Sequence, residues 1–325
     1  MKGFSGRFFK KGHRNGVGVT FFGDRVRIVG LGRRGNAFFL CGNADVGIPP
    51  GSLLFSGEIA DPQVVSEAIA EAAARSGMQY KKVVGALHGE KVIIRQFYLP
   101  DMPNDELDSA VRWEAENVFP LAAGEFQVEY VTIGRQNVDG NVRLRILAAA
   151  APKELVWQYY DVFTRGGLNP IALEVEPVAL ARLLFLEHSC RPAESSALID
   201  FGSTTYVMIL SGGDLVFHKR ISGVCTGTAV EESQNGGSNQ GGEPSGVLGE
   251  VERSLKQYRV QNKEVGVSRI FISGAGVERS KIKDELEERL KLPAAEFSFL
   301  SGGSGERIPA DYGTAVGLAL REVMA

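Results

Sequence analysis

The residues with the clearest chemical potential follow an apolar run and read Asp200-Phe-Gly-Ser-Thr-Thr205. Backbone N–H groups of such a tight turn can bind phosphate oxygens, the hydroxyl groups add donors, and a carboxylate can hold a hydrated magnesium ion. The candidate phosphate-binding residues are therefore Gly202, Ser203, Thr204 and Thr205, and Asp200 is the candidate magnesium residue. A polar β-turn has the same composition, so this segment alone does not separate the two interpretations.

A second segment, Ile272-Ser-Gly-Ala-Gly276, is a strand that ends in small residues and leads into a helix. A nucleotide base and ribose can pass close to the bare backbone of Gly274, Ala275 and Gly276. By itself the segment is also typical of an ordinary strand-to-helix connection. Because both segments lie in the same half of the chain, together they predict a nucleotide-binding site.

Other chemical motifs are absent or have a simpler explanation. Gly30-Leu-Gly-Arg-Arg-Gly35 has the dinucleotide-binding spacing, but a strand follows where a helix is required, so we interpret it as a hairpin turn. The sequence has no P-loop, serine-hydrolase or zinc-protease motif, and its 4 histidines share no ligand spacing. The acids between Asp101 and Val118 indicate the solvated face of a helix.

Composition excludes several classes of protein. The 36 Lys and Arg residues against 39 Asp and Glu give a net charge of −3, so no overall positive field attracts nucleic acid. The 3 cysteines lack CxxC spacing, which excludes a disulfide framework and indicates a reducing compartment. No apolar run has the length of a membrane span, so we expect a cytoplasmic protein.

The elements that must position these residues alternate between strands and helices, which predicts an α/β fold. Two three-strand meanders, at 16–41 and 196–221, indicate two related halves. Helices are predicted at 62–76, 104–118, 152–165, 176–184, 247–258, 282–290 and 312–323. Further strands are predicted at 81–87, 92–98, 126–133, 142–150, 171–175 and 269–273. The glycine-rich polar stretch at 228–246 predicts a flexible loop.

Several segments, in order along the chain, carry a family resemblance. They include Val84-Gly-Ala-Leu-His-Gly, Ile94-Arg-Gln-Phe-Tyr-Leu-Pro100, Leu147-Ala-Ala-Ala-Ala-Pro-Lys-Glu-Leu155, Gly167-Leu-Asn-Pro-Ile-Ala-Leu-Glu-Val-Glu176, Leu198-Ile-Asp-Phe-Gly-Ser and Ile270-Phe-Ile-Ser-Gly-Ala-Gly276. With these segments the chain resembles the PilM family of type IV pilus assembly proteins, which are actin-like ATPases related in fold to FtsA. The resemblance runs from about residue 16 to the C-terminus.

The resemblance implies a duplicated, ribonuclease H-like actin fold with two lobes around a nucleotide cleft. The implied first lobe is 16–92 and 166–195, a small subdomain inserted in it is 93–165, and the second lobe is 196–325. It also implies ATP and magnesium as ligands of the residues at 200–205 and 274–276.

Two departures from the family pattern weaken that site. The family's first hairpin ends in an Asp-x-Gly-Ser phosphate loop, whereas this chain has Thr20-Phe-Phe-Gly-Asp24. Thr20 replaces the acid, and the bulky Phe22 falls where the loop glycine should let backbone approach a phosphate. The interval from Gly223 to Leu248, where the family has a longer helical segment, is mostly the polar loop. We therefore expect half an ATP site, with hydrolysis weak or absent.

The function that the resemblance implies is a cytoplasmic scaffold of a type IV pilus, peripheral at the inner face of the cytoplasmic membrane. Its expected partners are other pilus assembly proteins and a short N-terminal cytoplasmic segment of an inner-membrane PilN-type protein. That segment docks in a groove beside the inserted subdomain, so membrane association is indirect. The sequence does not locate the groove residues.

Two alternatives remain open at this point. The first is an active ATPase or phosphotransferase of the same fold, such as a sugar kinase, with Asp200 as the catalytic acid. The second is the equivalent component of a type II secretion or mannose-sensitive pilus machine.

Overall fold

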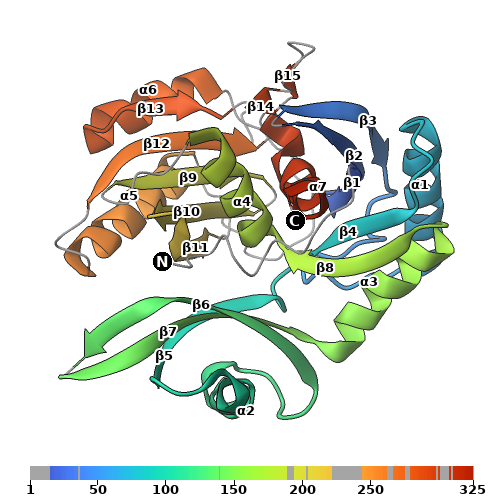
Figure 1. The fold of residues 1–325 in the computed structure, drawn as a ribbon. Helices are drawn as coiled ribbons and strands as arrows, with labels where there is room; N and C mark the ends of the chain where they lie inside the picture. Colours follow the sequence, from blue (N-terminus) through green and yellow to red (C-terminus); the bar gives the residue numbers. More distant parts are fainter. Residues whose placement is uncertain are drawn as a thin grey trace, which may run out of the picture.

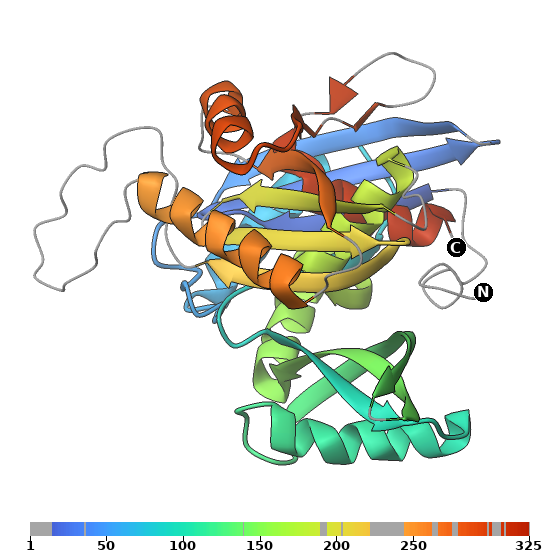
Figure 2. The ribbon, with the colours of Figure 1, turned by 90° about the vertical axis from the view of Figure 1, so that its left-hand side faces the viewer.

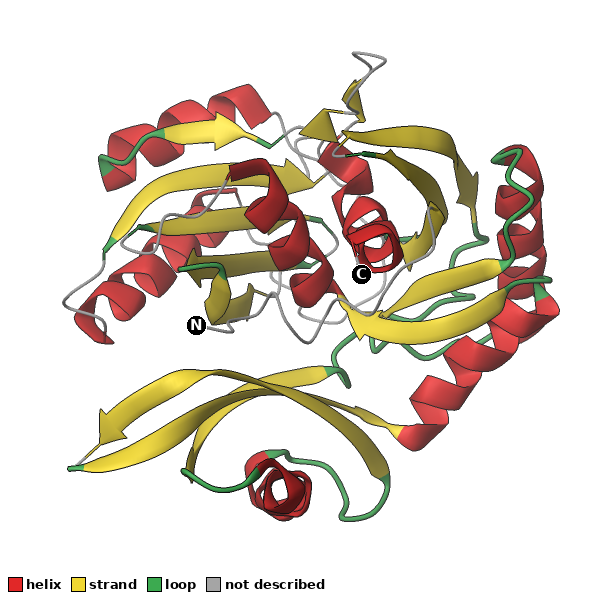
Figure 3. Ribbon diagram, in the orientation of Figure 1, coloured by secondary structure: helices red, strands yellow, loops and turns green. Residues whose placement is uncertain are grey.

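Two five-stranded sheets, one three-stranded sheet and one two-stranded sheet are present in the described part of the protein, whose structure is a computed structural model (Figure 1). The residues that the structure describes are 15–35, 37–138, 140–188, 194–202, 204–221, 244–261, 266–274, 279–297, 299–300, 307–308 and 310–324. Helices pack on both faces of the two larger sheets, and the helix at 104–118 packs on the small sheet (Figure 3). The α/β class predicted from the sequence is confirmed.

The first sheet has the strand order β3-β2-β1-β4-β8. β1, β2 and β3 form an antiparallel meander, and β4 and β8 extend the sheet in parallel from β1. Their bounds are β1 Asn15–Phe21, β2 Arg25–Arg34, β3 Ala37–Gly47, β4 Lys82–Leu87 and β8 Asn169–Val175. Helices α1 (Pro62–Arg75) and α3 (Lys153–Arg165) cover one face through a core that contains Phe21, Ile69 and Tyr159.

The second sheet repeats this topology, with the order β11-β10-β9-β12-β13. Its strands are β9 Ser195–Phe201, β10 Thr205–Ser211, β11 Asp214–Ile221, β12 Val267–Gly274 and β13 Ala294–Glu296. Helices α5 (Pro244–Gln261) and α6 (Arg279–Leu290) pack on its outer face through a core that contains Leu248, Ile272 and Leu286. The repeated order confirms the two related halves that the meanders predict.

Helices α4 (Glu176–His188) and α7 (Gly313–Met324) lie between the two sheets (Figure 1). Short elements lead into α7, namely β14 Phe299–Leu300, β15 Arg307–Ile308 and the 3-10 turn η1 Ala310–Tyr312. A Cβ atom on Gly18 of β1 would lie 2.0 Å from the carbonyl oxygen of Ala315, and one on Gly317 would lie 2.1 Å from that of Ala179. These two glycines therefore let α7 approach β1 on one side and α4 on the other at backbone distance.

The small sheet, with the order β5-β7-β6, projects from the rest of the molecule (Figure 2). Its strands are β5 Ile93–Pro100, β6 Phe126–Val138 and β7 Asn141–Pro152, and α2 (Asn104–Val118) packs on one face. The insertion enters after β4 and returns through α3 to β8, so it interrupts the parallel part of the first sheet. The amide of Gln96 donates a 2.9 Å hydrogen bond to the carbonyl oxygen of Val216 on β11.

The element boundaries follow local signals in the sequence. Asp61 caps α1 by accepting hydrogen bonds from Gln63 and Val64, and Gly166 ends α3, as predicted. The turn at Gly35 joins β2 to β3, which confirms the hairpin. The predicted loop at 228–246 lies outside the described residues as far as 243, and it ends earlier than predicted because α5 begins at Pro244. None of the described helices combines the length and apolar character needed to cross a bilayer.

Candidate functional site

The two segments predicted to bind nucleotide lie side by side at one edge of the second sheet. β9 and β12 are parallel neighbours, with Asp200 paired to Ser273 and Phe201 paired to Gly274. Gly274 has a φ of +94°, and a Cβ atom there would lie 1.8 Å from the Phe201 carbonyl oxygen, so only glycine fits. Gly202 and Thr204 are buried in the adjoining turn and Thr205 is buried at the start of β10, whereas Ser203, Ala275 and Gly276 lie outside the described residues.

Phe22, in the turn after β1, lies directly against this edge. A Cβ atom built on Gly202 would lie 2.8 Å from Cε2 of the Phe22 ring. Thr20, the residue that replaces the expected acid, is only 3% exposed and pairs across the hairpin with Arg27. The aromatic ring therefore lies where backbone and phosphate would meet in an open phosphate loop.

Arg27 fills the space next to the Phe22 ring. Its guanidinium carbon lies 4.3 Å from the Phe22 ring centroid and 5.6 Å from that of Tyr312. Nη1 of Arg27 donates a 2.7 Å hydrogen bond to the carbonyl oxygen of Asp311, and Nε contacts a carboxylate oxygen of Asp45 at 3.1 Å. The residue is 4% exposed, so a buried positive charge with four neighbours lies between the sheets.

Asp200 has a perturbed acidity because the surrounding protein desolvates its carboxyl group. Desolvation and the negative charge of Glu176 raise the pKa of Asp200 to about 7, although a hydrogen bond from Ser273 and the positive charge of Arg27 act in the opposite direction. Asp200 is therefore partly protonated near neutral pH.

Glu176 is a site residue that the sequence predicts only as the start of a helix. It is 8% exposed, and its Oε2 lies 3.7 Å from Nδ1 of His88. Desolvation and the charge of Glu176 raise the pKa of Tyr206 well above its ordinary value. The signal that could have found Glu176 is its place after the buried end of β8, which matches the place of Asp200 at the end of β9. The sequence does not identify Arg27 as a site residue, because its position in the pattern of β2 is that of an ordinary strand residue.

ATP and magnesium, the ligands that the resemblance implies, do not fit this arrangement of side chains. A phosphate at Gly202 would need the space of the Phe22 ring, and a cation beside Asp200 would meet the charge of Arg27. Across the described part of the chain, no group of three or more His, Cys, Asp or Glu side chains converges as metal ligands would.

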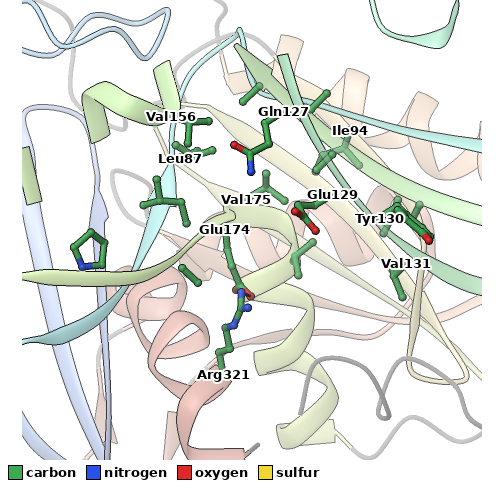
Figure 4. A pocket seen from close by; sticks show the side chains of 18 of the residues that line it. Leu87, Ile94, Gln127, Glu129, Tyr130, Val131, Val156, Glu174, Val175 and Arg321 are labelled. Carbon is green, nitrogen blue, oxygen red and sulfur yellow. Dashed lines mark hydrogen bonds and ion pairs between the residues drawn. The ribbon is translucent and has the colours of Figure 1, made fainter. Parts of the chain in front are cut away.

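A second site is a cavity of about 640 Å³ between the small sheet and the first sheet (Figure 4). β6 and β8 are the terminal strands of their sheets, and both line the cavity. The apolar side chains of Ile94, Val131 and Val175 face it, with Gln127 and Glu129 as the polar groups of β6. Terminal strands leave backbone N–H and C=O groups for another strand, so an extended peptide matches this cavity.

A buried ion cluster forms the base of the cavity. Glu174 of β8 pairs with Arg182 of α4 at 2.9 Å and with Arg321 of α7 at 2.6 Å. Burial alone would raise the pKa of Glu174, but the two guanidinium groups hold it below its ordinary value. Arg321 lines the cavity and its side chain is 34% exposed, so it offers donors to a bound segment. Arg182 instead donates to the carbonyl oxygen of Gly317 at 2.7 Å and ties α4 to α7.

Comparison with known proteins places this geometry in a family. A family model described as type IV pilus assembly protein PilM matches residues 18–225. Among solved structures, a chain of a PilM–PilN type IV pilus biogenesis complex superposes with a TM-score of 0.79 at 22% identity, over 95% of this chain and 98% of that one. The actin-like fold predicted from the resemblance is therefore confirmed.

More distant structures share less of the fold. The cytoplasmic domain of EpsL, an inner-membrane component of the type II secretion system of Vibrio cholerae, has a TM-score of 0.48 at 10% identity and covers 81% of this chain and 84% of its own. The ethanolamine utilization protein EutJ from Carboxydothermus hydrogenoformans has a TM-score of 0.46 at 14% identity, with 94% and 89% covered. No curated protein sequence matches the chain.

Proposed function

Because the chain belongs to the PilM family of type IV pilus assembly proteins, we propose that it is a scaffold that captures the N-terminal cytoplasmic segment of a PilN-type inner-membrane protein. The cavity between β6 and β8 is the docking site. The observation that carries this proposal is the position of that cavity between two terminal strands, with apolar walls and a charged base.

The shape and chemistry of the cavity define the segment that it accepts. Backbone groups of β6 or β8 pair with an extended chain, which fixes its direction without dictating its sequence. Side chains of the segment that point inward meet Ile94, Leu147 and Val175, so they are apolar. Ile171 and Tyr160, both partly exposed at the cavity, continue the apolar surface outward. The guanidinium of Arg321 selects a carbonyl or carboxylate group at the deep end.

The remaining parts of the proposal concern location and catalysis. Capture of a membrane protein's segment holds the chain at the inner face of the cytoplasmic membrane without contact with lipid of its own. ATP hydrolysis is weak or absent, since Thr20 supplies no carboxylate and Phe22 fills the phosphate loop. The inserted subdomain at 93–165 supplies one wall of the docking site, and the lobe at 16–92 and 166–195 supplies the other.

The test is a fluorescence-polarisation titration of a labelled N-terminal segment of the PilN-type protein from the same organism. We expect saturable binding to the native chain and a loss of at least about tenfold in affinity for Ile171→Arg, which puts a charge at the apolar mouth of the cavity. Val142→Arg is the matched control, because Val142 is a 50% exposed apolar residue on the small sheet and does not line the cavity. The proposal fails if the native chain does not retain the segment, or if the two variants bind it equally.

A further inference from the structure

We infer that Phe22 and Arg27 form an internal clasp that takes the place of a nucleotide between the first and second sheets. The clasp is defined by these two residues and the groups they contact, Gly202, the Asp311 carbonyl and Tyr312. This inference goes beyond the proposed docking function and does not depend on it, because no clasp residue lines the cavity between β6 and β8.

The first step of the argument is that the clasp joins the end of β1 in the first sheet to the end of β9 in the second, beside the core that α4 and α7 form between the two sheets. Phe22 follows β1 in the first sheet, and Gly202 follows β9 in the second. The approach of 2.8 Å between the Phe22 ring and a Cβ atom built on Gly202 shows that ring and backbone are in direct contact. In a two-lobed protein, a group that contacts both lobes only when they are closed stabilises the closed arrangement by that contact energy.

The second step concerns charge. Arg27 is anchored in the first sheet through Asp45 and reaches across to the carbonyl oxygen of Asp311 and the ring of Tyr312 in η1. η1 in turn packs against β12 of the second sheet. The guanidinium is close enough to Asp200 for its charge to lower the pKa of that carboxyl, against the effect of desolvation. Arg27 therefore supplies the positive charge that a bound metal ion would otherwise bring to this edge.

The third step is thermodynamic. A nucleotide holds two lobes together only while it is bound, so its effect depends on its concentration. A clasp made of the chain's own residues acts at a high and constant effective concentration. The two sheets, and with them the helices α4 and α7 at the base of the docking cavity, stay in one arrangement whatever the level of ATP. The protein is thereby a permanently closed member of a nucleotide-dependent fold.

The first experiment is calorimetric titration of the native chain, Phe22→Gly and Phe22→Ser with ATP plus magnesium. We expect no saturable binding to the native chain. Either variant should bind ATP with an affinity at least about tenfold above the detection limit that the native chain sets, because each substitution frees the face of Gly202. The serine variant keeps the test valid if glycine at position 22 impairs folding. Equal affinity for ATP in the native chain and both variants would overturn the inference.

The second experiment measures the closure itself by small-angle X-ray scattering without nucleotide. We expect Arg27→Ala to increase the radius of gyration, whereas Arg25→Ala does not. Arg25 is the matched control because it also pairs with Asp45, at 2.5 Å, but has a side chain that is 48% exposed. An unchanged radius of gyration in Arg27→Ala would overturn the clasp. The two proposals are tested by different measurements. ATP affinity and the radius of gyration test the clasp, and titration of Phe22→Gly with the labelled PilN-type segment tests the docking site. If the segment does not bind, the two clasp measurements keep their meaning.

Discussion

Asp200 makes the stability of this protein depend on pH in a direction opposite to that of most carboxylates. Desolvation raises its pKa to about 7, so the folded chain holds a proton that the unfolded chain releases at lower pH. The free energy of unfolding attributable to Asp200 therefore falls as the pH rises from about 4 to about 7.

Replacement of Asp200 by Asn removes this proton and with it the penalty for a charged, desolvated carboxylate. We expect the melting temperature of Asp200→Asn, relative to the native chain, to increase between about pH 5 and about pH 8, by about 2–4 °C for each kcal/mol of penalty removed. Thermal unfolding followed by circular dichroism at both pH values gives the answer. A relative melting temperature that stays constant or decreases would mean that Asp200 is already ionised in the folded chain at the lower pH.

Some of the site residues could be predicted from the sequence and others could not. Asp200 and Gly274 could be predicted, because each ends an apolar strand, and parallel strands bring such ends together. Phe22 could be recognised only against the family pattern. Arg27 could not be predicted, since the alternation that makes it a strand residue does not reveal that it faces another sheet. Arg27 is only 4% exposed, and its burial depends on η1, a segment far away in the chain.

At the scale of elements, the contact of α7 with α4 depends on the absence of a side chain at Gly317. A Cβ atom there would lie 2.1 Å from the backbone carbonyl oxygen of Ala179, which cannot move without displacing α4. We expect Gly317→Ala to lower the free energy of unfolding by about 1–3 kcal/mol, measured by chemical denaturation.

Gly249→Ala is the matched control for this prediction. Gly249 also lies within a helix, α5, but a Cβ atom there meets nothing within 4 Å. Alanine at this position should leave stability unchanged or raise it by about 0.4–1 kcal/mol, because the unfolded chain loses freedom. If both variants are equally stable, α7 and α4 are not held at backbone distance.

Element types were predictable where the hydrophobic period extends over several turns. α1, α2 and α3 begin and end close to the predicted residues, because caps, prolines and glycines mark their ends. The short strands β13, β14 and β15 were not predicted, since segments of two or three residues carry no measurable period. The location of α7 between the sheets also could not be predicted from the sequence, because its apolar residues and glycines are compatible with many packing partners.

At the scale of the whole molecule, the small sheet is held by its two chain connections and by contacts with the second sheet. One of these is the hydrogen bond from the Gln96 amide to the carbonyl oxygen of Val216, at 2.9 Å. The connection into β5 adds an ion pair between Glu90 and Arg220 of β11, at 2.7 Å. These contacts set the width of the cavity between β6 and β8, because they fix the wall that the small sheet provides.

Removal of the Gln96 contact should therefore loosen the small sheet without unfolding the protein. We expect Gln96→Ala to accelerate amide hydrogen exchange in β5, β6 and β7 by about 3–10-fold, the effect of one hydrogen bond of about 1 kcal/mol. Exchange in β9 and β10 should not change. Gln136→Ala is the control, since Gln136 accepts a hydrogen bond from Tyr98 within the small sheet itself, at 2.9 Å. Similar exchange rates in the two variants would contradict a bracing role for Gln96.

The packing of α7 on β1 also has a consequence for synthesis on the ribosome. β1, at residues 15–21, is translated long before the helix at residues 313–324 that covers the face of β1 holding Gly16 and Gly18. One face of the first sheet therefore stays uncovered until residues 313–324 have been translated, whereas the small sheet, local in sequence, can form much earlier. During that interval the nascent chain exposes an apolar strand surface, so chaperone contact is expected to concentrate on β1.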